Sequence, residues 1–167
     1  MKSHIERVVD LVGRATSWLA LAIVVLMAIN VVLRYTLSWG SVWAQELEWH
    51  LLVPLIMFGI PFALYKGDHV RVDVLFEKFS PRTQAWVDVV SQVLGLAIAG
   101  LFFWLCLAYV GQSYAIDETS SDPGGLPYRW VLKALLPAGF ALLALQCVAT
   151  LLGDIAKLRA LGRGDAP

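Results

Sequence analysis

Leu47 to Phe79, which reads LEWHLLVPLIMFGIPFALYKGDHVRVDVLFEKF, is the stretch that decides the fold. The apolar run at about residues 46–65 is long enough to cross the ~30 Å core of a bilayer as a helix. An acidic and aromatic segment, Glu46 to His50, begins this run, and a basic segment that begins at Lys66 follows it. We therefore expect a transmembrane helix with polar residues at both membrane faces.

Three further apolar runs lie on either side of this stretch, at about residues 16–37, 85–114 and 131–152. The hydrophobic fraction of 59% exceeds the roughly 45–50% of a typical soluble domain. The first run is longer than the apolar core of a signal peptide and lacks a small-residue cleavage site, so we expect it to remain as a span. The pattern predicts an all-α integral membrane protein, with residues 1–167 forming a single domain of four transmembrane helices.

Shorter segments around these spans carry their own predictions. Residues 1–14 are amphipathic, and they are expected either to lie on the membrane surface or a partner, or to be the polar start of the first span. Residues 72–79 place apolar side chains on one face, which is typical of a short interfacial helix. Pro54 and Pro61 are expected to bend the second span, and residues 154–167 to form a polar, frayed tail.

The distribution of basic residues predicts the orientation in the membrane. With four spans, Arg34, Arg129 and Lys133 lie on one side, and the other ten of the thirteen basic residues lie on the side of the termini. Basic residues are enriched in cytoplasmic segments. We therefore expect both termini in the cytoplasm.

Glu46 and His50 are the first candidates for chemistry, because their i, i+4 spacing places them on one helix face. Ionisable groups within a span are costly and often functional, so one interpretation is a proton relay or a metal pair. The other is that both lie at the membrane interface, partly hydrated, or contact a partner subunit.

Other chemistries find little support in the sequence. Cys106 and Cys147 lie alone in apolar runs, and only His50 comes near the bilayer depth that haem ligation requires. The net charge of zero gives no nucleic-acid footprint. We expect no catalytic residue, metal or cofactor. The residues favour an accessory subunit, and a stand-alone small transporter or four-helix membrane enzyme is the alternative.

Several short motifs resemble the small membrane subunit (DctQ-like) of tripartite ATP-independent periplasmic (TRAP) transporters. The motifs, in order, are Asn30-Val31-Val32-Leu33-Arg34-Tyr35, Trp43-Ala44-Gln45-Glu46-Leu47, Gly59, Lys66-Gly67-Asp68-His69-Val70-Arg71-Val72-Asp73, Leu126-Pro127 and Pro137-Ala138-Gly139. The resemblance extends over essentially the whole chain, and the order and spacing of the motifs together with the four-span topology make it specific.

The resemblance implies a subunit of a secondary transporter in the bacterial inner membrane. Such a subunit would brace a large multi-span permease subunit that imports an organic acid delivered by a periplasmic binding protein. Coupling would be to an ion gradient, usually sodium, through the large subunit. Expected structural or partner-docking residues are Arg34, Trp43, Glu46, His50, His69, Arg71 and Asp73. The loop with Asp117, Glu118 and Asp122 is expected either to contact the binding protein or to be a solvated turn.

Overall fold

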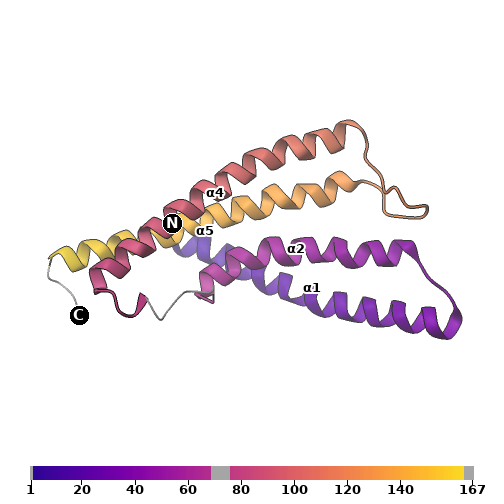
Figure 1. The fold of residues 1–167 in the computed structure, drawn as a ribbon, viewed down its shortest axis with the longest axis horizontal. Coiled ribbons are helices and arrows are strands. Elements are labelled where there is room, and N and C mark those ends of the chain that lie inside the picture. The colour runs from indigo at the N-terminus through magenta and orange to yellow at the C-terminus, as the bar shows by residue number, and fades with distance from the viewer. Residues whose placement is uncertain (1, 69–75, 164–167) are drawn as a thin grey trace.

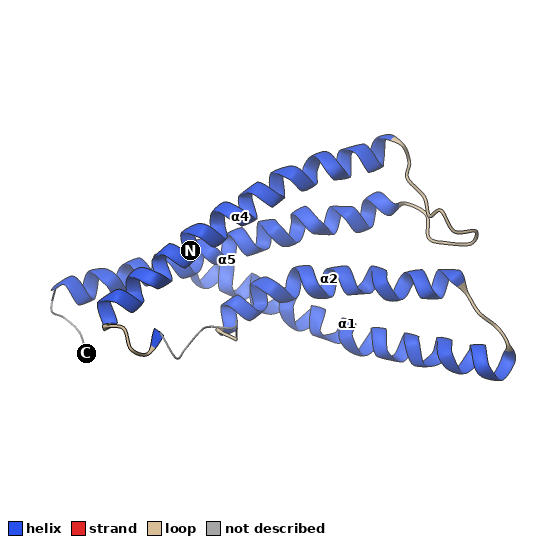
Figure 2. Ribbon diagram, viewed as in Figure 1, coloured by secondary structure: helices blue, strands red, loops and turns tan. Residues whose placement is uncertain are grey.

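The computed structural model describes residues 2–68 and 76–163, and its regular structure in these ranges is entirely helical (Figures 1 and 2). The helices are α1 (Lys2–Leu37), α2 (Val42–Lys66), α4 (Pro81–Ala115) and α5 (Arg129–Arg163). All four are long and apolar enough to cross a membrane. The predicted class, an all-α membrane protein with four spanning helices, is confirmed.

Local sequence signals account for where the helices begin and end. Ser41 is the N-cap of α2, and its side chain accepts a hydrogen bond from the amide of Ala44. Ser80 caps α4 in the same way, with Pro81 in the first turn, where its missing N–H costs nothing. Helix α2 ends at Gly67, whose φ of 77° is the left-handed conformation that glycine adopts without strain.

The chain forms two helical hairpins, α1–α2 and α4–α5, which pack together mainly through α2 and α5. Helix α4 packs against α5, and α1 packs against α2 and also reaches α5. The loops at residues 38–41 and 116–128 lie at one end of the molecule, here called the loop end (Figure 1). The start of α1 and the end of α5 lie toward the opposite end of the molecule, here called the terminal end. The two hairpins converge there (Figure 1).

The helices are longer than the spans predicted from hydropathy. Helix α1 has 36 residues, which corresponds to about 54 Å at 1.5 Å per residue. Residues 2–14 belong to this uninterrupted helix and do not form a separate surface helix. The expected frayed tail is also corrected as far as the structure describes it, because α5 continues from Asp154 to Arg163. The first half of the interfacial helix expected at residues 72–79, residues 72–75, lies outside the described residues.

Small residues allow the helices to approach closely. A Cβ atom added at Gly13 would lie 2.1 Å from Cδ2 of Phe62, and one added at Gly139 would lie 2.7 Å from Cβ of Met57. At Gly95 the nearest atom would be Sγ of Cys147, at 3.2 Å. Such contacts are typical of membrane helices, where packing replaces the hydrophobic effect as the main driving force for association.

Candidate functional site

Glu46 is the centre of a polar network at the loop end. It lies in the second turn of α2, and only 3% of its surface is exposed. The hydroxyl of Ser120 donates to Oε1 of Glu46, and the main-chain N–H of Leu126 donates to Oε2. We call these three residues the Glu46 network. It attaches the loop between α4 and α5 to the start of α2, and thereby joins the two hairpins.

Gly125 allows the loop to close over this carboxylate. A Cβ atom at this position would lie 2.4 Å from Oγ of Ser120 and 2.7 Å from Oε2 of Glu46. The loop is also closed on itself, because the N–H of Ser120 donates to the carbonyl of Leu126 at 3.2 Å. Any larger residue at position 125 would displace one of the groups that hold Glu46.

Two cations from the first turns of α5 border this network. The guanidinium of Arg129 lies 3.9 Å from Oε1 of Glu46 and 5.4 Å from the ring centre of Trp49. Lys133 donates to the carboxylate of Glu118, and its ammonium lies 4.0 Å from the ring centre of Tyr109. The hydrogen bond from Lys133 holds the pKa of Glu118 below its ordinary value of 4.5. Glu118 is therefore a carboxylate at neutral pH, paired with Lys133.

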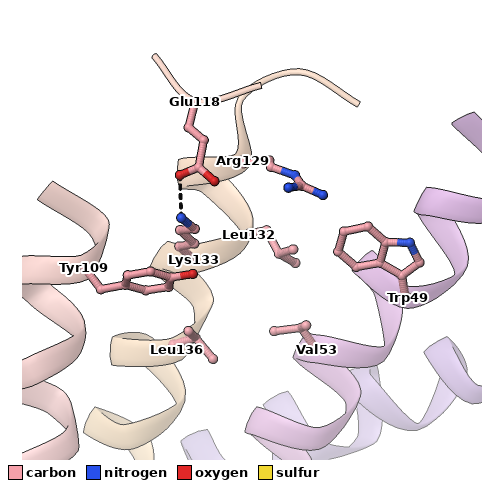
Figure 3. A pocket seen from close by; sticks show the side chains of 8 residues that line it. All are labelled: Trp49, Val53, Tyr109, Glu118, Arg129, Leu132, Lys133 and Leu136. Atoms are coloured by element: carbon pink, nitrogen blue, oxygen red, sulfur yellow. Dashed lines mark hydrogen bonds and ion pairs between the residues drawn. The ribbon is translucent and has the colours of Figure 1, made fainter. Parts of the chain in front are cut away.

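A cavity of about 220 Å³ lies beside these cations, between α2, α4 and α5. Figure 3 shows the charged side chains of Glu118, Arg129 and Lys133 at one end of it and apolar side chains at the other. The lining residues are Trp49, Val53, Tyr109, Glu118, Arg129, Leu132, Lys133 and Leu136. The cavity thus has a polarity gradient along the direction of the helices.

His50 and Glu48 make separate contacts. Nδ1–H of His50 donates to the main-chain carbonyl of Glu46 at 2.7 Å, and the His50 ring lies 4.2 Å from that of Trp49. Oε1 of Glu48 accepts from Nδ2 of Asn30 on α1 at 3.1 Å. The carboxylate of Glu46 is directed to the loop, so the i, i+4 spacing does not produce a hydrogen-bonded Glu46–His50 relay.

The burial of Glu46 corrects the expectation that this carboxylate is partly hydrated at the membrane interface. The start of a helix is ordinarily open to water, but here residues 120–126 fold over it. The reason is that a buried carboxylate needs donors, and the loop supplies a hydroxyl and a main-chain amide. Glu46 thus links the start of α2 to the loop between α4 and α5.

The remaining predicted residues are dispersed. Arg34 is exposed in the last turn of α1. Trp43, 47% exposed, lines with Asn30 a groove of about 210 Å³ between α1 and α2. Asp117 and Asp122 are exposed on the loop. His69, Arg71 and Asp73 lie outside the described residues.

Sequence reasoning missed the partners of Glu46. Ser120, Gly125 and Arg129 belong to the network or border it, and Lys133 holds Glu118. The available signal was charge, because Arg129 and Lys133 are two of the three basic residues on this side of the predicted topology. In the described ranges, no three His, Cys, Asp or Glu side chains are grouped so that they could hold a metal ion.

A second polar link lies toward the terminal end. Asp10 of α1 accepts from Nζ of Lys66 on α2 at 2.8 Å, and from Nε of Arg14 on its own helix at 2.8 Å. This ion pair joins the end of α2 to the first turns of α1. The polar contacts at both ends thus hold helices together.

The fold and these contacts define a small multi-pass membrane protein with four spanning helices and internally paired charges. Residues 23–157 match the family described as tripartite ATP-independent periplasmic transporters, DctQ component. The chain belongs to this family of TRAP transporter small permease subunits.

Individual relatives agree with this assignment. The chain is 32% identical over 124 residues to the putative TRAP transporter small permease protein of Haemophilus influenzae, covering 70% of this chain and 76% of that protein. It is 29% identical over 105 residues to the C4-dicarboxylate TRAP transporter small permease protein DctQ of Rhodobacter capsulatus, covering 63% and 45%. It is also 24% identical over 116 residues to the isethionate TRAP transporter permease protein DctMQ of Oleidesulfovibrio alaskensis, covering 70% and 18%. The chain therefore spans less than half the length of the last two relatives.

Proposed function

We propose that this chain braces the large permease subunit of a TRAP transporter during ion-gradient-driven import of an organic acid that a periplasmic binding protein delivers. The family match over residues 23–157 carries the proposal. Two relatives carry an organic acid in their names, isethionate in one and C4-dicarboxylate in the other. The chain matches only 18% of the permease protein DctMQ. This supports a function in which the chain lies next to a much larger permease segment.

The distribution of polar groups supports a bracing role. Glu46, Glu118 and Asp10 are each paired within the chain, so these carboxylates hold the helices in position. The outer helices present large apolar side chains instead, with Trp18 on α1 and Trp104 on α4 both 72% exposed. These faces suit lipid and the apolar surface of a membrane partner.

The proposed topology places both termini in the cytoplasm and the loop end in the periplasm, because most basic residues lie toward the terminal end. The exposed Asp117 and Asp122 would then face the binding protein. We further propose that sodium coupling resides in the large subunit. This subunit would supply the substrate and ion sites, while His69, Arg71 and Asp73 would contact it or support its docking from the cytoplasmic side.

Co-purification tests the bracing role. The chain, tagged and expressed with a large TRAP permease subunit from the same genome, should retain that permease in mild detergent, and liposomes should import the acid only when both chains and the binding protein are present. Glu46→Gln should lower the yield of the complex before it alters substrate preference. Import by this chain alone would contradict the proposal and favour a stand-alone transporter. A monomer that never retains the permease would also contradict it.

A further inference from the structure

Arg129 has hydrogen-bonding capacity that the described part of the chain does not use. Its buried Nε has no hydrogen-bond partner there, and its guanidinium lies 3.9 Å from a Glu46 oxygen that already accepts from Ser120. A buried guanidinium donor without an acceptor is costly. Arg129 also lines the cavity, where an additional acceptor would be stabilised by the outer N–H groups of its guanidinium.

The chemistry of the cavity wall indicates what kind of acceptor fits. Arg129 and Lys133 lie at its loop end together with Glu118, which Lys133 binds, so an anionic group there would bind Arg129 and share Lys133 with Glu118 (Figure 3). Val53 and Leu136 lie farther along the helices, at the opposite side of the cavity (Figure 3). A small free anion would leave these apolar side chains against water, whereas an amphiphile would cover both parts.

The level of the cavity along the helices fits the headgroup region of a bilayer. Trp49 and Tyr109 form two of its walls. At the same end of α4 and α5, the ring centres of Tyr114 and Trp130 lie 5.4 Å apart. Trp and Tyr side chains gather where the hydrocarbon core meets the headgroups. Basic pockets between transmembrane helices at this level are suited to lipid phosphates.

We propose that this cavity binds one glycerophospholipid of the leaflet at the loop end. The phosphodiester lies between Arg129 and Lys133, and accepts from the outer guanidinium nitrogens of Arg129, of which Nη2 lies 3.9 Å from Glu46, beyond hydrogen-bond distance. The upper part of an acyl chain lies against Val53, Leu132 and Leu136. Trp49 packs against the glycerol region. The proposal does not depend on which partner the chain braces.

Native mass spectrometry of the full-length chain, titrated with short-chain phosphatidylglycerol in an uncharged detergent, tests the proposal. The wild-type chain should bind one lipid molecule. Arg129→Gln should weaken binding about tenfold or more, because a charge-assisted hydrogen bond to phosphate is lost. Leu136→Trp keeps every charge and fills the cavity, so it should reduce binding to a similar extent even if Arg129→Gln disturbs the fold.

Matched controls lie on the same helix. Arg159→Gln removes a cation from the exposed surface near the other end of α5, and Leu145→Trp enlarges a side chain in a different groove. Both should bind lipid as the wild type does. Equal binding by Leu136→Trp and Leu145→Trp would overturn the proposal. So would displacement of the lipid by equimolar inorganic phosphate or succinate, because the cavity would then be a site for a free anion.

Discussion

Gly139→Ala is the substitution that tests the packing of the two hairpins most directly. A Cβ atom at this position would lie 2.7 Å from Cβ of Met57, 3.0 Å from its carbonyl oxygen and 3.2 Å from its carbonyl carbon. Two of these three atoms belong to the backbone of α2 and cannot move by a change of rotamer. The added methyl group must therefore push α2 and α5 apart at the contact that joins the hairpins.

The expected magnitude has two components of opposite sign. Overpacking of a well-packed contact costs about 1–3 kcal/mol, and replacing glycine by alanine within a helix returns about 0.8–1 kcal/mol. Because backbone atoms make this contact, we expect a cost in the upper part of that range, and a net loss of about 1–2 kcal/mol. Gly59→Ala is the matched control, since a Cβ atom added at Gly59 would have no neighbouring atom within 4 Å; it should gain about 0.5–1 kcal/mol.

Reversible unfolding by SDS in mixed micelles, followed by circular dichroism, measures both variants. The free energy of unfolding should be about 2 kcal/mol lower for Gly139→Ala than for Gly59→Ala, the sum of the two opposite effects. If Gly139→Ala were as stable as Gly59→Ala, the close approach of α5 to Met57 would not limit packing, and this account of the contact between hairpins would be refuted.

Three further substitutions test the polar contacts and the first hairpin. Glu46→Gln should make the loop at residues 116–128 several times more sensitive to protease, because it replaces a buried carboxylate that accepts two hydrogen bonds. Glu48→Gln is the control, and equal cleavage of the two variants would contradict the prediction. Glu118 has a lowered pKa in the folded chain. Its ion pair therefore stabilises the fold when the pH is above the ordinary pKa of a glutamate, and this stabilisation is lost as the pH falls through the lowered pKa. Thermal stability should therefore fall more on acidification for the wild type than for Glu118→Gln, and parallel pH profiles would argue against the pairing. Gly13→Ala should lower the free energy of unfolding in SDS, since its Cβ would lie 2.1–2.7 Å from Phe62, and an unchanged value would show that this side chain can move aside.

The number and order of spanning helices could be predicted because each depends on a local apolar run. Helix ends were harder to predict, since hydropathy reports the segment inside the bilayer and not the continuation of the helix beyond it. Helix α5 continues past Asp154 because residues such as Ala156, Lys157 and Leu158 favour helix, although they are more polar as a group than the span. Residues 2–14 extend α1 for the same reason.

The network at the loop end could be predicted only in part. Spacing along α2 places Glu46 and His50 on one face, but the direction of the carboxylate is set by Ser120 and Leu126, which are 74 and 80 residues away in the chain. Periodicity carries no information about contacts at that separation. Gly125 was visible as a loop residue, but the need for glycine arises only when the loop lies against Glu46.

The same separation along the chain gives the Glu46 network a consequence for biogenesis. Ribosomes add about 5–20 residues per second, so the donors of Glu46 are synthesised about 4–16 seconds after Glu46 itself. During that interval the α1–α2 hairpin is present without the loop that covers its carboxylate. The carboxylate of Glu46 therefore remains uncovered at the loop end until the second hairpin is inserted. Burial of Glu46 thus reports that the whole chain has assembled.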